Sequence, residues 1–144
     1  MHVADILKVK GATVHTVRSD QSIERIAHRL RAERVGALIV SENGSTVDGI
    51  ISERDLVYGL SEHGAAIMTM TAADLMTRGV VTCSPDDTIS HVAKVMTQRR
   101  IRHLPVTEGR NLVGIVSVGD VVKYRLDELE LETNVLRDYA VARQ

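Results

Sequence analysis

The sequence predicts an α/β fold built from two like halves, each with the element order β-α-β-β-α. The first observation is a repeated segment: residues 49–55 read Gly-Ile-Ile-Ser-Glu-Arg-Asp, and residues 114–120 read Gly-Ile-Val-Ser-Val-Gly-Asp. The second is that short β-type apolar runs alternate with apolar residues at helical spacing in both halves. An internal repeat indicates two like folding units, and 144 residues suffice for two small halves that share a core.

Strands are predicted at equivalent places in both halves. Each half opens with a short β run, over residues 14–17 and 80–83. Each later contains two strands joined by a polar loop with Gly and Asn, which is a hairpin signal. The strand pairs are 37–40 with 47–52, and 103–106 with 112–117. The second hairpin loop is one residue shorter than the first, at the place where length is easiest to change.

Two helices are predicted in each half. Ser22 and Thr88 are the expected N-caps of the first helices, on the strength of their hydroxyls alone. The second helices start near Glu53 and near Val118. One buried face of each first helix is predicted from apolar residues at helical spacing: Ile23, Ile26, Ala27 and Leu30, and Ile89, Val92, Ala93 and Met96.

Short helical leaders are expected before both halves, over residues 3–7 and 73–76. The small, apolar stretch 64–71 joins the halves. Beyond Asp120 the chain reads as one long helix. Its apolar stripe either packs on the chain's own body or forms a dimer contact: Val121, Val122, Leu126, Leu129, Val135 and Leu136.

Composition excludes several classes of function. The chain has no Phe, no Trp and three Tyr, so its core is aliphatic and base stacking on aromatic platforms is not expected. The net charge of −1 implies no general affinity for nucleic acid. No apolar run is long enough for a signal peptide or membrane span. The single cysteine, Cys83, reads as a core residue in a reducing compartment. These features predict a cytoplasmic protein.

No catalytic or metal-binding pattern is present. The histidines have no metal-ligand spacing with one another or with Cys83. The P-loop pattern of ATPases is absent, and the segment 114–119 has one spacer too many for a nucleophile elbow. We therefore expect no enzyme activity and no bound metal.

The Gly-apolar-apolar-Ser-x-x-Asp segments 49–55 and 114–120, together with Arg99-Arg100-Ile101-Arg102-His103-Leu104-Pro105-Val106, resemble the cystathionine-β-synthase (CBS) domain. The resemblance runs from about Val3 to Tyr124 and implies a tandem CBS pair, or Bateman module, whose two repeats pack as a pseudo-two-fold pair. No enzyme or transporter domain is attached, so the chain resembles a stand-alone regulatory protein of bacterial type. The expected limits are 1–63 for the first domain with its leader, 64–71 for the linker, 72–126 for the second domain and 127–144 for a helical extension.

The repeated motif has chemistry suited to a sugar phosphate. A strand that ends in a hydroxyl before a helix start leaves free backbone N–H groups, which favour anions. An ionised Asp accepts two hydrogen bonds and matches the vicinal hydroxyls of a ribose. The alternative is that each Ser-x-x-Asp only caps its helix. In the family the carboxylate takes the ribose and the hydroxyl helps with phosphate, which implies these roles for Asp55, Asp120, Ser52 and Ser117.

The resemblance implies two unequal ligand clefts between the halves. The residues before and at the start of the second strand are placed at the base: Gly36 and Ala37, and Arg102 and His103. One cleft combines Ile50, Ser52, Arg54 and Asp55 with Thr82, Asp87 and Ile101; its mirror combines Ile115, Ser117 and Asp120 with Thr16, Gln21 and Val35. Arg54 and Arg102 are expected at phosphate because a guanidinium binds phosphate through a planar fork; the alternative is a solvated charge or a local salt bridge.

The predicted function is a ligand-sensing module for signal transduction. It binds an adenine nucleotide between its halves, and a partner protein reads the resulting change in conformation or assembly. AMP is the favoured ligand because one ribose carboxylate and few cations suit a monophosphate; ATP, ADP and NAD(H) are alternatives. A homodimer is expected from the resemblance. The other hypothesis is a structural or protein-interaction module with vestigial clefts.

Overall fold

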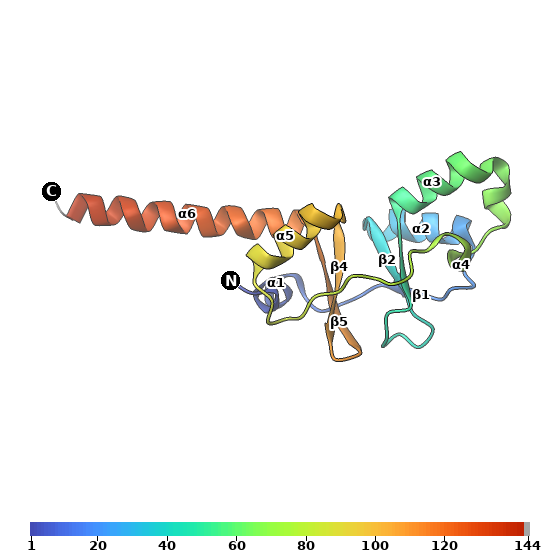
Figure 1. Ribbon diagram of the computed structural model, residues 1–144, viewed down its shortest axis with the longest axis horizontal. Coiled ribbons are helices and arrows are strands. Elements are labelled where there is room, and N and C mark those ends of the chain that lie inside the picture. The colour runs from blue at the N-terminus through green and yellow to red at the C-terminus, as the bar shows by residue number, and fades with distance from the viewer. Residues whose placement is uncertain (143–144) are drawn as a thin grey trace.

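The computed structural model describes residues 1–142 and confirms a mixed α/β pair of like halves (Figure 1). In the first half, β1 pairs parallel to β2, and β2 pairs antiparallel to β3. Its elements are β1 (Thr16–Val17), α2 (Ile23–Glu33), β2 (Ala37–Val40), β3 (Gly49–Ser52) and α3 (Glu53–His63).

The second half has the same order with one strand fewer. Its elements are α5 (Ile89–Arg99), the antiparallel pair β4 (His103–Glu108) and β5 (Asn111–Ser117), and α6 (Val118–Ala142). The strand expected over 80–83 is reduced to one parallel bridge between Cys83 and Val106. Cys83 N–H donates to the Pro105 carbonyl at 3.0 Å, and Thr107 N–H donates to the Cys83 carbonyl at 2.8 Å. This segment therefore follows β4 for only one residue.

Both first helices begin and end in the same way. The Ser22 hydroxyl accepts from Arg25 N–H at 3.2 Å, and the Thr88 hydroxyl accepts from His91 N–H at 3.0 Å, which confirms both N-caps. Each helix ends on an arginine in the left-handed conformation, Arg34 and Arg100, both with φ 55°. Such a conformation is costly for a residue with a Cβ. It turns the chain abruptly from the helix toward the next strand.

The registers place the two motifs at matching points of the sheets. Ser52 lies opposite Ala37, and Ser117 lies opposite His103, at the edge where each hairpin gives way to its second helix. The motif serines therefore stand beside the start of the preceding strand in both halves.

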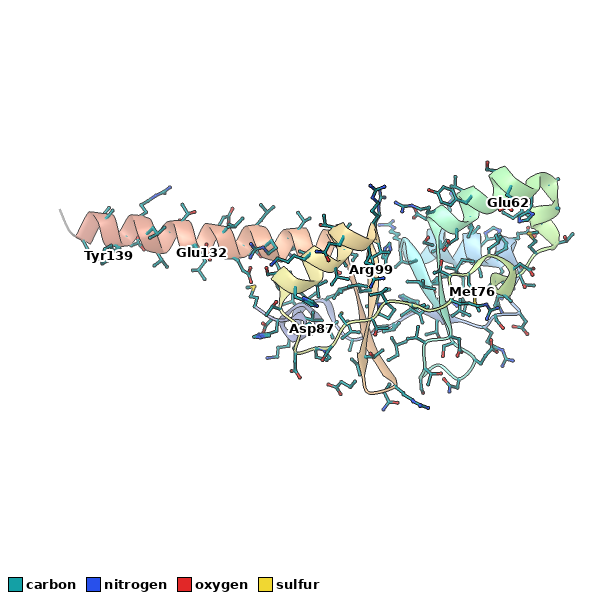
Figure 2. All side chains as sticks on the ribbon, viewed as in Figure 1. Glu62, Met76, Asp87, Arg99, Glu132 and Tyr139 are labelled. Atoms are coloured by element: carbon teal, nitrogen blue, oxygen red, sulfur yellow. The ribbon has the colours of Figure 1, made fainter. Side chains whose placement is uncertain are left out.

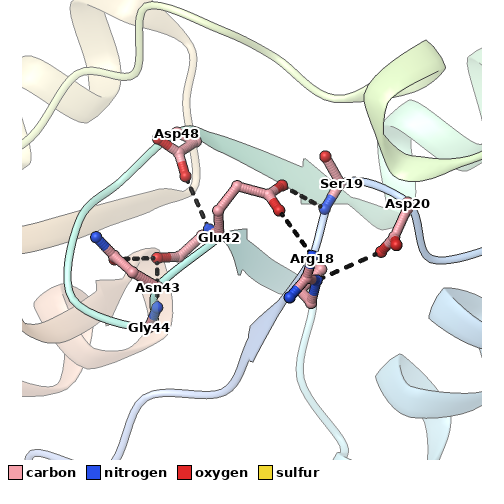
Figure 3. Close-up of polar contacts among 8 residues, drawn as sticks. Arg18, Ser19, Asp20, Glu42, Asn43, Gly44 and Asp48 are labelled. Atoms are coloured by element: carbon pink, nitrogen blue, oxygen red, sulfur yellow. Dashed lines mark hydrogen bonds and ion pairs between the residues drawn. The ribbon is translucent and has the colours of Figure 1, made fainter.

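The hairpin loops differ in length and in support. In the first, Glu42 N–H donates to Asp48 at 2.9 Å, and the Glu42 carboxylate accepts from Ser19 N–H at 2.9 Å (Figure 3). Arg18 adds an ion pair to Glu42 at 3.7 Å. This loop is thus held against the chain leaving β1. The second hairpin closes more tightly, because β4 and β5 remain paired out to Glu108 and Asn111.

The leader helices pack across the pair. α1 (Val3–Lys10) precedes the first half in sequence, yet its buried Val3 and Ile6 belong to the core of the second half. α4 (Ala72–Leu75), which follows the 3₁₀ helix η1 (Gly64–Thr69), contributes to the core of the first half. Each leader therefore completes the core of the other repeat.

Matching backbone bonds hold the two leaders. Val3 N–H donates to the Asp87 carbonyl at 2.9 Å, and Ala72 N–H donates to the Gln21 carbonyl at 2.9 Å. Both cores are aliphatic apart from Tyr124 and Cys83 in the second. One detail of the predicted helix faces is wrong: Ala27 is exposed, because the buried stripe of α2 is narrow and runs along Ile23, Ile26 and Leu30.

Candidate functional site

A cleft of about 450 Å³ lies between the two halves. The first half contributes the end of β3 and the start of α3, and the second half contributes the turn from α5 into β4. Its lining combines polar and charged side chains with the aliphatic side chains of Ile50, Val57 and Ile101. The lining residues are Gly36, Ile50, Ser52, Glu53, Arg54, Asp55, Val57, Thr77, Arg100, Ile101, Arg102 and His103.

Asp55 uses one carboxylate oxygen for the backbone. Its Oδ2 accepts from Ser52 N–H at 2.8 Å and from the Ser52 hydroxyl at 3.0 Å, while Asp55 N–H donates back to that hydroxyl at 3.4 Å. The motif therefore does cap α3. The other oxygen, Oδ1, has only a long contact of 3.5 Å with the Thr77 hydroxyl. Capping leaves this oxygen as an acceptor in a half-buried part of the cleft wall.

Three guanidinium groups line one end of the cleft. They belong to Arg54, Arg100 and Arg102, all exposed, and Arg54 bridges the halves by donating to the Arg100 carbonyl at 3.4 Å. Among residues 1–142, no carboxylate lies within ion-pair distance of any of these three arginines. Their forks are therefore available to an anion. This argues against the alternative that Arg54 or Arg102 serves a local salt bridge.

His103 fills the boundary between the halves. A Cβ built at Gly36 would lie 3.0 Å from both Cε1 and Nε2 of the imidazole, so only glycine lets the ring approach β2 this closely. Burial, followed by the positive charge of Lys10, holds the pKa of His103 below its usual value of 6.5. The ring is therefore neutral at pH 7 and offers one donor and one acceptor.

Lys10 lies beside the second motif, at the place that Thr77 takes beside the first. Its ammonium donates to Asp120 Oδ2 at 2.7 Å and to the Ile115 carbonyl at 3.0 Å. In the first cleft, the carbonyl equivalent to that of Ile115 belongs to Ile50 and accepts from the backbone N–H of Thr77 at 2.9 Å. A side-chain cation in one half thus replaces a main-chain donor in the other.

The ion pair changes the titration of the second acid. Burial alone would raise the pKa of Asp120, but hydrogen bonds from Lys10 and from Ser117 N–H outweigh it, and the pKa lies below its usual value. Asp120 also accepts from Ser117 N–H at 2.9 Å, as Asp55 does from Ser52. The main-chain bond from the motif serine to the acid is therefore the same in both halves, whereas within residues 1–142 only the second acid has a cation at ion-pair distance, on the same Oδ2 that caps the helix.

The structure brings most residues predicted for the first cleft together in one cavity wall. The other predicted residues of the two clefts lie elsewhere. Eight share the cleft wall: Gly36, Ile50, Ser52, Arg54, Asp55, Ile101, Arg102 and His103. Ile115, Ser117 and Asp120 meet at Lys10 instead. The backbone of Asp87 and of Gln21 holds the leader helices. Ala37 and Val35 lie in or against the first core, the Thr16 carbonyl accepts from Arg29, and Thr82 is exposed outside the cleft wall.

Sequence reasoning missed several residues of the two sites. In the first cleft these are Glu53, Val57, Thr77 and Arg100. Arg100 had a signal, since it belongs to the segment 99–106 on which the family resemblance rests. Thr77 and Lys10 had none, because both reach their motif only through the crossed packing of the leaders.

A second hollow of about 470 Å³ lies between α5 and α6 and adjoins the cleft. The two share Arg54, Arg100, Ile101 and Arg102. Its floor is apolar, with Met96, Val118, Val121, Val122 and Leu126 among its residues.

Within residues 1–142 the structure offers neither a metal site nor a helix able to span a membrane. No three His, Cys, Asp or Glu side chains gather in an arrangement able to hold a metal ion. Of the helices in this range, none has the length and apolar character needed to cross a bilayer. Cys83 is buried, and burial followed by the charge of Asp87 raises the pKa of its thiol to about 12, which makes it unreactive.

Comparison with known proteins identifies the repeat. The family model described as "CBS domain" matches residues 3–62 and again residues 72–127. A CBS-domain containing protein, ATU1752 from Agrobacterium tumefaciens, is 42% identical, with a TM-score of 0.84 over 87% of this chain and 99% of that one. The mitochondrial CBS domain-containing protein CBSX3 of Arabidopsis thaliana is 29% identical over 95% of this chain and 70% of its own length.

One similar structure was solved with ligands. The CBS domain pair of protein MJ0100, in complex with 5-methylthioadenosine and S-adenosyl-L-methionine, is 29% identical to this chain. Its TM-score is 0.78, and the match covers 89% of this chain and 98% of that one.

Proposed function

Because the chain belongs to the CBS domain family, we propose that it is a regulatory module that binds an adenine nucleotide in the cleft between its two repeats. CBS pairs bind adenosine-containing ligands, as the complex of MJ0100 illustrates. In this proposal the protein is not an enzyme. Nucleotide binding favours one arrangement of the repeats, or of a homodimer, and a partner protein responds to that arrangement. A ligand shifts such a balance only through its different affinities for the two states.

The observation that carries the proposal is the pairing of Asp55 with three arginines across one cleft. The Oδ1 atom of Asp55 is an acceptor for ribose hydroxyls, and the guanidinium groups of Arg54, Arg100 and Arg102 are donors for phosphate. Ile50 and Ile101 supply apolar surface for a purine. This combination suits a nucleotide better than a purely apolar or purely anionic ligand.

We propose AMP as the first ligand to test, with ADP, ATP and NAD(H) as alternatives. A cleft with few phosphate-directed cations suits a monophosphate. Since Arg100 adds a third guanidinium to the cleft, a longer phosphate chain is a direct competitor. The same proposal assigns the nucleotide to the first cleft, because three arginines line it, whereas Lys10 already pairs with Asp120 Oδ2 beside the second motif.

Thermal melting with each nucleotide at millimolar concentration tests the proposal. A ligand that binds only the folded protein raises the melting temperature by mass action, with about 2.7 kcal/mol of stabilisation at a concentration 100 times its Kd. Asp55→Ala is expected to abolish most of this shift. If Asp55→Ala and Asp120→Ala together leave the shift unchanged, the assignment of ribose to these acids is wrong.

Asp74→Ala is the matched control for the cap. Asp74 Oδ2 accepts from Thr71 N–H at 2.9 Å at the start of α4, the same capping geometry as in Asp55, but Asp74 does not line the cleft. Both substitutions remove the N3 carboxylate of a capping box and are expected to lower the stability of the free protein to a similar extent. Only Asp55→Ala is expected to change the ligand-induced shift.

A homodimer in the cytoplasm is part of the proposal. α3 exposes Val57 and Leu60, and α6 exposes Val122 and Leu126, so both second helices have apolar faces open to another protein. These same faces favour the second candidate function, an interaction module whose clefts are vestigial. In that case no nucleotide changes the melting temperature, while sedimentation still shows association.

A further inference from the structure

The C-terminal part of α6 leaves the body of the molecule. The family match ends at residue 127, while α6 continues to Ala142 and projects along the long axis, away from both halves (Figure 1). Every residue from 129 to 142 is exposed, and Figure 2 shows Glu132 and Tyr139 on this projecting part, far from the sheets. The expected packing of this stripe on the chain's own body is therefore confined to the start of the helix, where Val121 and Tyr124 are buried.

The exposed stripe has the spacing of a coiled coil. Positions 122, 126, 129, 133, 136 and 140 alternate between steps of four and three residues, and they hold Val, Leu, Leu, Thr, Leu and Ala. This is the seam of the a and d positions of a heptad repeat. Leu129 is 48% and Leu136 is 69% exposed, so the seam is open along its length. Helices this polar depend on packing of an apolar face for most of their stability.

The charges beside the seam specify an occupant. With Leu126 and Thr133 at a positions, Arg125 and Glu132 fall at g, and Glu130 and Arg137 fall at e. In a parallel pair of identical helices, each g residue faces the e residue five positions later on the other copy. Arg125, which also pairs with Glu128 of its own helix at 2.7 Å, then meets Glu130, and Glu132 meets Arg137. The dimer has four such interhelical pairs, each of opposite charge.

We propose that α6 forms a parallel two-stranded coiled coil with α6 of a second copy of this chain. Val122 and Leu126 belong both to this seam and to the apolar hollow between α5 and α6, so the contact continues onto the body. A parallel pair has its two-fold axis along α6, which Figure 1 shows to be the long axis of the molecule. The dimer is therefore head to head, with first half beside first half. The inference rests on the proposed homodimer and does not depend on nucleotide binding.

Cysteine cross-linking tests the seam and its direction. In a parallel pair, a cysteine at the seam position 136 faces the cysteine at position 136 of the other chain. A cysteine at position 131 lies on the outside of the pair. Under mild oxidation Leu136→Cys is expected to form a covalent dimer at least tenfold faster than Leu131→Cys. Cys83 is 7% exposed, so we expect it to form no cross-link in either variant or in the parent protein.

Sedimentation of the same variants separates the possible failures. Equal cross-linking rates in a protein that sediments as a dimer overturn the parallel seam and leave the homodimer standing. A monomer at all concentrations overturns both.

Charge reversal gives a second, independent measurement. Glu130→Arg with Glu132→Arg makes all four flanking positions basic, and Arg125→Glu with Arg137→Glu makes them all acidic. Each double variant alone is expected to dimerise at least tenfold more weakly than the parent chain, and an equimolar mixture is expected to recover the dimer. Failure of the mixture to recover contradicts the proposed pairing.

Discussion

Lys10 and Asp120 are 2.7 Å apart, whereas within residues 1–142 no cation lies within ion-pair distance of Asp55. This difference adds to the arginines that line the first cleft, and it makes the surroundings of the two acids unequal although both accept from the N–H of their motif serine. Beside the second motif a nucleotide meets an ammonium that already bonds Asp120 Oδ2 and the Ile115 carbonyl, where the first cleft has the backbone N–H of Thr77. One nucleotide per chain is therefore expected at moderate concentration.

Lys10→Met is expected to raise the stoichiometry from one nucleotide per chain to two. The substitution keeps an unbranched apolar stem on α1 and frees both acceptors beside Ser117. Isothermal titration calorimetry counts the sites. Lys8→Met removes the same charge from an exposed position of the same helix and is expected to leave one site. Two sites in the parent protein, or one in Lys10→Met, would contradict this role for Lys10.

At the scale of elements, α2 and α5 both end on an arginine with the same backbone conformation, so the two positions can be compared directly by mutation. Arg34 and Arg100 both cap their helices at φ 55°, where a side chain costs about 1 kcal/mol relative to glycine. Arg34→Gly and Arg100→Gly are both expected to raise the free energy of unfolding by about that amount in urea titrations. Because only Arg100 lines the cleft, only Arg100→Gly is expected to weaken nucleotide binding. If Arg34→Gly and Arg100→Gly changed the affinity for nucleotide equally, Arg100 would have no specific role in the site.

Local patterns predict the elements well and their partners less well. The hydroxyl caps at Ser22 and Thr88, the hairpins and the helix starts after Ser52 and Ser117 follow from short-range spacing. The strand at 80–83 fails, because β4 has Pro105 where β2 has Ile39, and proline has no backbone N–H to donate to a neighbouring strand. The same limit applies to Lys10: its helical leader is visible in the sequence, but apolar residues at 3 and 6 are equally compatible with either core.

At the scale of the molecule, the crossed leaders couple the two repeats. Ile6 lies near the start of the sequence, yet it belongs to the core of the second half, with Ile89 and Leu104. The substitution Ile6→Ala therefore creates a cavity in that core. We expect a loss of about 2–5 kcal/mol, the range for such truncations. Hydrogen exchange is expected to show the lost protection first in α5, β4 and β5. Ile26→Ala, a fully buried residue of the other core, serves as control with the reverse pattern. Loss confined to residues 1–63 in Ile6→Ala would contradict the crossed packing.

The same exchange of leaders bears on the ancestry of the chain. A solitary repeat, with its own leader directed outward, has a core that lacks Val3 and Ile6 or their counterparts Ala72 and Leu75. Such a unit is completed only when a second copy supplies the missing leader, so we infer that an ancestral single repeat had to associate in pairs. Joining two repeats in one polypeptide makes that association intramolecular.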